Sequence, residues 1–98
     1  MIVITGTVRI AHGALERARP AMETMIRASR EEEGCIAYSY GVDVLDPDLI
    51  HVSEKWESRD ALAEHFNSPH MAEWRKTISQ VGLTDRDLRL FEGNGEPV

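Results

Sequence analysis

The stretch that decides the fold of this chain is LIHVSEKWESRDALAEHFNSPHMAEWRKTI, residues 49–78. Its first eight residues alternate, with Ile50, Val52, Glu54 and Trp56 on one face, which is typical of a β-strand. After residue 58 the apolar residues recur three and four apart, as they do in helices. The stretch holds both tryptophans, three of the four histidines and one of the two phenylalanines, so we expect a functional site here.

Two short helices are predicted to follow this strand. Ser58 suits a helix N-cap, and Ser68 followed by Pro69 suits a second cap with proline at the first helical position. Gly82 is expected to end the second helix. Side chains at helical spacing give the two segments a face that can pack on a sheet: Leu62, His65, Phe66, Met71, Trp74, Arg75 and Ile78.

The N-terminal part predicts a strand and a long helix. Residues 2–10 alternate, and Gly6 leaves a gap on their apolar face. The gap indicates a bulge, close packing against a helix, or room for a ligand. Residues 14–32 have helical periodicity interrupted by Pro20, so the helix either kinks or begins there. Gly34 suits the left-handed conformation that follows a helix end.

The other segments predict strands. Residues 35–45 alternate and are expected to form a hairpin with residues 49–56 across the turn Asp46-Pro47-Asp48. One face of the first hairpin strand holds Ile36, Tyr38, Tyr40, Val42 and Val44. Residues 87–92 predict the last strand, and residues 93–98 an irregular tail. The order predicts a single α+β domain over residues 1–98, a ferredoxin-like βαββαβ sandwich with an antiparallel sheet. Helices cover one face of such a sheet, and a second copy of the chain is expected to cover the other.

Composition limits the choice of partners and compartment. The formal net charge of −6 argues against nucleic acid and anionic membranes, which call for a basic surface. The single cysteine, Cys35, cannot form an internal disulfide, which favours a reducing compartment. The sequence has no apolar run long enough to span a membrane and no signal-peptide pattern at its N-terminus. We therefore expect a cytoplasmic protein.

No strong catalytic motif is present, but two side chains are unusual for their positions. Glu54 shares a strand face with apolar residues, so it is expected either to cap backbone or pair with Arg75, or to act as a base with a raised pKa. His65 is either a hydrogen-bonded core residue or a proton acceptor. His65 and His70 straddle the break at Pro69, so their spacing supports no metal site. Cys35 is interpreted as a small apolar filler.

Four motifs together resemble the antibiotic biosynthesis monooxygenase (ABM) domain, with the nearest likeness to small bacterial quinol monooxygenases. They are Glu32-Glu33-Gly34-Cys35, Glu54-Lys55-Trp56-Glu57-Ser58, the pair Leu62 and His65, and Ser68-Pro69-His70-Met71. The resemblance extends from residue 2 to about residue 91. It implies a dimeric α+β barrel made of two ferredoxin-like sheets. It also implies oxidation of phenolic or quinol substrates by O₂ without metal, flavin or haem.

The resemblance carries over to single residues only in part. Of the four side chains that hold the substrate in polyketide-oxidising members, the tryptophan falls on Trp56 and the arginine on Arg75, whereas the asparagine and tyrosine positions hold Val52 and Leu62. That polyketide substrate is therefore not implied. Haem degradation is not implied either, since the positions used by haem-degrading relatives look like Gly6, His65 and about Arg75.

The leading hypothesis is a cofactor-free monooxygenase of a small aromatic or quinol substrate that acts as a homodimer. In it His65 takes the phenolic proton, Arg75 stabilises the anion and Trp56 stacks on or hydrogen-bonds to the substrate. The other candidate substrate-binding residues are Tyr38, Val52, Glu54, Leu62, His70 and Trp74. Two alternatives remain open: an isomerase of a small phosphorylated signalling sugar, and a non-catalytic dimeric binding or stress-response domain.

Overall fold

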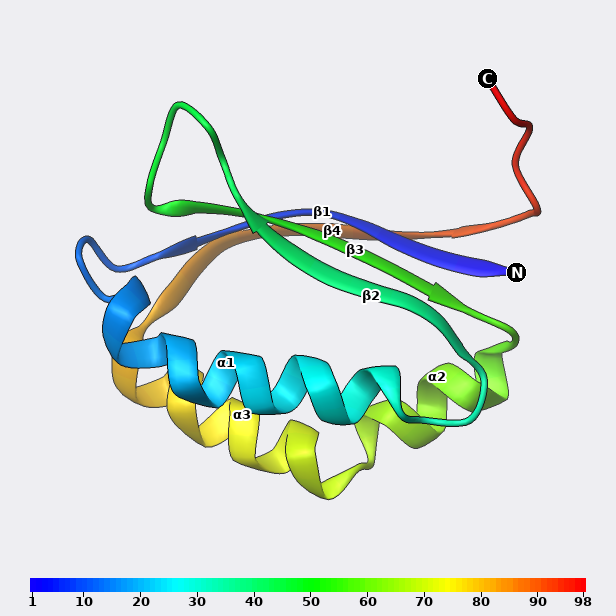
Figure 1. Cartoon of the computed structure of the whole chain (residues 1–98), viewed down its shortest axis with the longest axis horizontal. Coiled ribbons are helices and arrows are strands. Elements are labelled where there is room, and N and C mark those ends of the chain that lie inside the picture. The colour runs from blue at the N-terminus through cyan, green and yellow to red at the C-terminus, as the bar shows by residue number, and fades with distance from the viewer.

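The predicted βαββαβ order is confirmed by the computed structural model, which describes all residues from 1 to 98 (Figure 1). The elements in chain order are β1 (Ile2–Ile10), α1 (Leu15–Arg30), β2 (Cys35–Val42), β3 (Leu49–Trp56), α2 (Arg59–Phe66), α3 (Pro69–Val81) and β4 (Leu83–Glu92). The second crossover therefore holds two helices, as the break at Pro69 predicts.

The four strands form one sheet in the order β2-β3-β1-β4, with every neighbouring pair antiparallel. All three helices lie on one face of this sheet, and the other face carries no helix (Figure 1). None of the helices is both long and apolar enough to cross a membrane.

The core lies between the helices and the covered face of the sheet. The inward positions of β1 and β3 are buried because alternate side chains of a strand point to the same face. They include Ile4, Val8, Ile50, Val52 and Trp56, and α1 adds Ala18, Met22 and Met25. Pro20 lies inside α1, which begins at Leu15, so the helix does not begin at the proline.

Capping of the two short helices agrees with the sequence. The Ser58 hydroxyl accepts a hydrogen bond from the backbone N–H of Ala61 at 3.1 Å, and the Ser68 hydroxyl accepts one from Met71 at 3.4 Å. Ser68 also donates to the carbonyl oxygen of His65 at 2.6 Å. The two hydrogen bonds of the Ser68 hydroxyl thus hold the last turn of α2 against the first turn of α3.

Two sequence predictions about the edge strands are wrong. β4 begins at Leu83 and not at residue 87, since a register shift against β1 between Thr7 and Arg9 lets the strand continue through a bulge. In β2 a register shift between Cys35 and Ala37 turns Ile36 outward, where it is 51% exposed. The alternation expected over residues 35–45 therefore fails at its first residues, and β2 itself ends at residue 42.

The gap at Gly6 is explained by the neighbouring strand. A Cβ atom at this glycine would lie 1.8 Å from the carbonyl oxygen of Asp87 in β4. Its backbone also has a φ of 149°, which other residues rarely adopt. The close approach is thus to a strand and not to a helix, and the position offers no room for a ligand.

Candidate active site

A cavity of about 330 Å³ lies between the covered face of the sheet and helices α2 and α3. Its lining is mostly apolar and aromatic, which suits a flat hydrophobic ring. Four ionisable side chains other than tyrosine border it: Glu54, His65, Arg75 and Arg86. The cavity therefore combines an aromatic interior with a few charged or titratable groups.

The structure brings most of the nine sequence-predicted site residues together at this cavity. Those that line it are Tyr38, Val52, Glu54, His65, Trp74 and Arg75. The other three lie outside its lining. Leu62 is buried in the core, and His70 borders a different groove. Trp56 is fully buried with its ring centroid 4.6 Å from that of His65.

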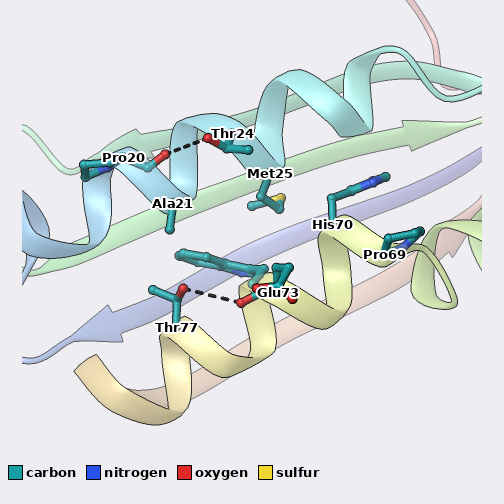
Figure 2. Close-up of a pocket in the computed structure, with 9 residues that line it drawn as sticks. Pro20, Ala21, Thr24, Met25, Pro69, His70, Glu73 and Thr77 are labelled. Carbon is teal, nitrogen blue, oxygen red and sulfur yellow. Dashed lines mark hydrogen bonds between the residues drawn. The ribbon is translucent and has the colours of Figure 1, made fainter.

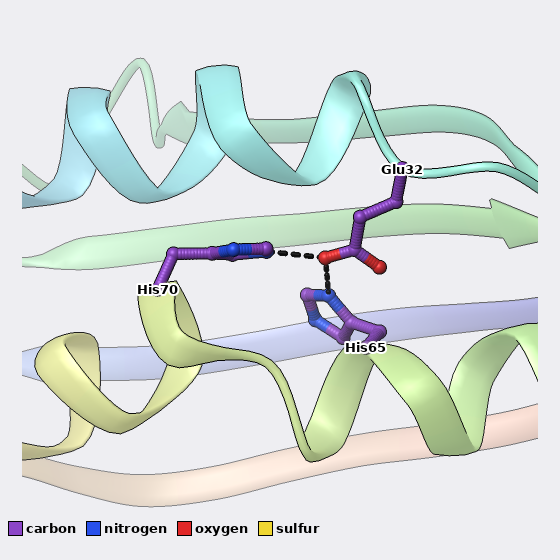
Figure 3. A group of neighbouring side chains, drawn as sticks. All are labelled: Glu32, His65 and His70. Carbon is purple, nitrogen blue, oxygen red and sulfur yellow. Dashed lines mark hydrogen bonds and ion pairs between the residues drawn. The ribbon is translucent and has the colours of Figure 1, made fainter.

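His65 is fully buried and is held by a carboxylate from a distant part of the chain. Its Nδ1 lies 2.9 Å from Oε1 of Glu32, and Nε2 of His70 bonds to the same oxygen (Figure 3). An ionised carboxylate only accepts hydrogen bonds, so Nδ1 of His65 carries the proton. Nε2 of His65 is then a free acceptor, and this buried atom has no hydrogen-bond partner.

The charge state of His65 follows from its burial. Desolvation lowers the pKa of His65 below its usual value, and the hydrogen bond that its Nδ1–H donates to Glu32 opposes this only in part. The ring is therefore neutral near pH 7, with a lone pair on Nε2. A neutral, oriented imidazole beside an aromatic cavity can accept a proton from a bound phenol.

Glu32 was not among the predicted site residues. The helical periodicity suggested a helix to about residue 32, whereas α1 ends at Arg30 and Glu32 lies in the turn before β2. From this turn its carboxylate reaches both histidines, which come from two different helices. The available signal was the family-like motif Glu32-Glu33-Gly34-Cys35, in which Glu32 is the first residue.

Glu32, His65 and His70 are also the residues that could hold a metal, since their ligand atoms lie within 4.8 Å of one another. Two imidazoles and a carboxylate are donors that several transition metals accept. In this structure the carboxylate already satisfies one nitrogen of each ring (Figure 3). The three side chains therefore form a hydrogen-bonded network that leaves only Nε2 of His65 buried without a partner.

Glu54 is buried, and it pairs with a tryptophan and not with Arg75. The indole N–H of Trp56 donates to Oε1 of Glu54 at 3.0 Å. Desolvation raises the pKa of Glu54, and the indole hydrogen bond partly offsets this effect. Arg75 instead donates from Nη2 to the carbonyl oxygen of Phe66 at 2.5 Å. Of the readings left open for Glu54, the pair with Arg75 is thus excluded.

The two tyrosines of β2 form a wall of the cavity. Their rings stack with centroids 5.7 Å apart, and their hydroxyl oxygens are 3.5 Å apart. Burial raises the pKa of both Tyr38 and Tyr40, so both hydroxyls stay protonated at neutral pH and can donate hydrogen bonds. Sequence reasoning identified Tyr38 as a wall residue but did not include Tyr40.

A second, more open groove of about 520 Å³ lies between α1 and α3 (Figure 2). Its threonine hydroxyls are used within their own helices, because Thr24 donates to the carbonyl of Pro20 and Thr77 to that of Glu73. His70 borders this groove and bonds to Glu32. The buried His65 is thereby linked through Glu32 to a partly exposed imidazole.

Comparison with known proteins identifies the family. The family model described as antibiotic biosynthesis monooxygenase matches residues 1–77. The chain belongs to this family.

The ABM chain is 33% identical over 91 residues to the uncharacterized protein sll1783 of Synechocystis sp., covering 93% of this chain and 62% of the relative. It is 32% identical over 63 residues to Rv0793 of Mycobacterium tuberculosis, which is named a putative monooxygenase, covering 64% and 61%. In sequence the chain thus matches about three fifths of the length of these relatives.

Solved structures share the fold of this chain. A Deinococcus radiodurans structure that carries the same family name superposes with a TM-score of 0.86 at 22% identity, covering 100% of this chain and 96% of that one. The structure of Rv0793 superposes with a TM-score of 0.82 at 22% identity, covering 99% and 98%. At this identity the likeness establishes the architecture of the ABM chain.

Proposed function

We propose that this ABM protein is a monooxygenase that oxidises a small quinol with O₂ and needs neither a metal nor an organic cofactor. The observation that carries the proposal is the buried, unpartnered Nε2 of His65 beside an aromatic cavity, with Nδ1 held by Glu32. Membership of the ABM family and the name of Rv0793 support a monooxygenase-like role.

The reaction begins with proton transfer from a quinol hydroxyl to Nε2 of His65. The resulting phenolate donates electrons to O₂, a ring carbon–oxygen bond forms and the O–O bond breaks. A quinol and O₂ thus give a hydroxyquinone and water: the ring loses four electrons, and the second oxygen atom leaves as water with two protons. Placing a general base in this way typically contributes about 10²–10⁴-fold to the rate.

The neighbouring residues have separate tasks in this scheme. Glu32 fixes the tautomer of His65 and stabilises the imidazolium that forms. Arg75 borders the cavity and places a positive charge near the phenolate. Tyr38, Tyr40 and Trp74 surround the ring and keep water from the intermediate. Trp56 does not line the cavity, so we assign it to positioning: it packs on His65 and satisfies Glu54.

A homodimer formed through the uncovered face of the sheet is part of the proposal. This face includes Val3 and Phe91, which are paired across β1 and β4, and Phe91 is 54% exposed. We also propose a cytoplasmic location, because the Cys35 thiol has no partner and burial raises its pKa, so a reducing compartment suits it. Light scattering of the purified protein tests the dimer directly.

Oxygen uptake tests the proposed reaction. The protein is stripped of metals with a chelator and mixed with a panel of hydroquinones and naphthols under ¹⁸O₂. We expect uptake that survives chelation and a quinone product that carries one ¹⁸O atom. Uptake that disappears on chelation and returns with metal would overturn the cofactor-free mechanism. Conversion of a substrate without O₂ would favour an isomerase, and tight binding without conversion would favour a binding domain.

A further inference from the structure

Two guanidinium groups at the cavity have no carboxylate partner. Arg75 comes from α3 and Arg86 from β4; both line the cavity and both are also exposed, so they lie at its mouth. Five of the other seven arginines form ion pairs, such as Arg9 with Asp46 and Arg59 with Glu92, whereas Arg17 and Arg30 do not. Two arginines without an ion pair thus meet at one cavity, in a chain of net charge −6.

A β-bulge brings Arg86 to the cavity. Thr84 pairs with Arg9 and Asp87 pairs with Thr7, so residues 85 and 86 together lie opposite the single residue between them on β1. Asp85 adopts a φ of 48°, a left-handed conformation that is uncommon for a residue other than glycine. In a regular strand residues 83 and 86 would face opposite sides, yet Leu83 and Arg86 both border the cavity. Bulges of this kind often re-aim side chains beside functional sites.

The geometry points to a quinol that carries a carboxylate as the substrate class. The ring of this quinol lies among the aromatic side chains, and one ring hydroxyl meets Nε2 of His65. Its carboxylate binds Arg86 with help from Arg75. This inference rests on the proposed function and specifies its substrate. Guanidinium groups bind carboxylates through paired, charge-assisted hydrogen bonds. The mostly apolar lining favours an aromatic ring over a polyhydroxylated sugar, which would need more polar partners.

Glu54 is the competing carboxylate for Arg86. It lines the same cavity, and the positive charge of Arg86 acts on it, but the two side chains are not within ion-pair distance. Glu54 is instead occupied by the indole N–H of Trp56. The guanidinium of Arg86 thus stays available to an incoming anion.

Anaerobic binding measurements test the inference without relying on turnover. The probes are 2,5-dihydroxybenzoate, its methyl ester and hydroquinone, and the readout is calorimetry or the quenching of tryptophan fluorescence. We expect the acid to bind at least tenfold more tightly than its ester. The preference should disappear in Arg86→Gln and be partly kept in Arg86→Lys. Arg89→Gln is the matched control, because Arg89 lies on the same strand and pairs with Asp87.

Each outcome either supports or overturns the inference. Equal affinity for acid and ester, or a preference that persists in Arg86→Gln while the variant melts like the parent, would overturn it. Tighter binding of phenyl phosphate than of benzoate would assign the anion site to a phosphate and overturn the carboxylate class. If the acid binds in an Arg86-dependent way but no oxygen is taken up, the proposed function is overturned and the carboxylate-binding site is not. If oxygen is taken up with neutral quinols and the rate does not depend on Arg86, the substrate class is overturned and the proposed function is not.

Discussion

The chain contains the same pair, a histidine bonded to a carboxylate, both at its surface and in its interior. At the surface, His12 lies 2.7 Å from Asp48 and His51 lies 2.8 Å from Asp43. In the interior, His65 lies 2.9 Å from Glu32. The carboxylate raises the pKa of His12, whereas burial lowers the pKa of His65. The comparison teaches that desolvation, and not the hydrogen bond, makes the interior histidine a neutral proton acceptor.

The largest expected effect is on the rate of oxygen uptake, and it distinguishes the buried histidine from a surface histidine. Replacing His65 with Asn should lower the rate constant of oxygen uptake by about 10²–10⁴-fold, because the general base is lost. His51→Asn removes a histidine from a surface pair and should leave the rate unchanged. Oxygen-electrode measurements on both variants check this, with circular dichroism as a control for folding. Similar rates for His65→Asn and the parent protein would remove His65 from the mechanism.

A smaller effect is expected when the carboxylate partner loses its charge. Glu32→Gln keeps an acceptor for Nδ1 of His65 but no longer stabilises the imidazolium, so we expect kcat to fall by roughly 10–100-fold. KM should change little, since Glu32 does not line the cavity. Asp43→Asn makes the same change in the surface pair with His51 and should have no effect on kcat. A change in KM alone would show that Glu32 acts on binding and not on proton transfer.

The smallest effect concerns stability and contrasts the buried Glu54 with the surface carboxylate Asp43. Burial raises the pKa of Glu54 in the folded state, so the folded protein holds this proton more tightly than the unfolded chain. Stability should therefore fall as pH rises from the usual range of a glutamate through the raised pKa. Glu54→Gln should abolish this fall and raise Tm at pH 7 above that of the parent protein, because no buried carboxylate then has to ionise.

The change of stability with pH that we expect from Asp43 has the opposite sign to that expected from Glu54. Its pKa is lowered by the hydrogen bond from His51, so its contribution is present above the usual pKa of an aspartate and is lost as pH falls. Thermal melts of Glu54→Gln, Asp43→Asn and the parent protein between pH 4 and 8 compare the two. A Glu54→Gln variant that is less stable than the parent at high pH would show that the ionised carboxylate is stabilising in the fold.

The elements that the sequence predicted well depend on residues close together in the chain. The caps at Ser58 and Ser68 need only the N–H groups three residues on, and the alternation of β1 and β3 needs only a period of two. These local signals determined the βαββαβ order. They also put His65 on an inward face of α2, because its spacing from Leu62 is helical.

The features that the sequence did not reveal depend on register and on long-range contacts. The partnership of Glu32 with His65 requires α1 to end at Arg30, whereas the predicted helix ran to about residue 32. The position of Arg86 depends on the bulge at Asp85, and a continuous strand pattern does not specify an extra residue. Such irregularities are set by the pairing of β4 with β1, which no local pattern records.

The most direct test of the account is the protonation state of His65, measured by ¹⁵N NMR of the histidine rings at pH 7. We predict a neutral ring with the proton on Nδ1 and a bare Nε2, and a pKa below that of His12 in the same titration. A ring that is protonated on Nε2, or one that titrates above His12, would contradict the claim that burial and Glu32 together prepare His65 as the base.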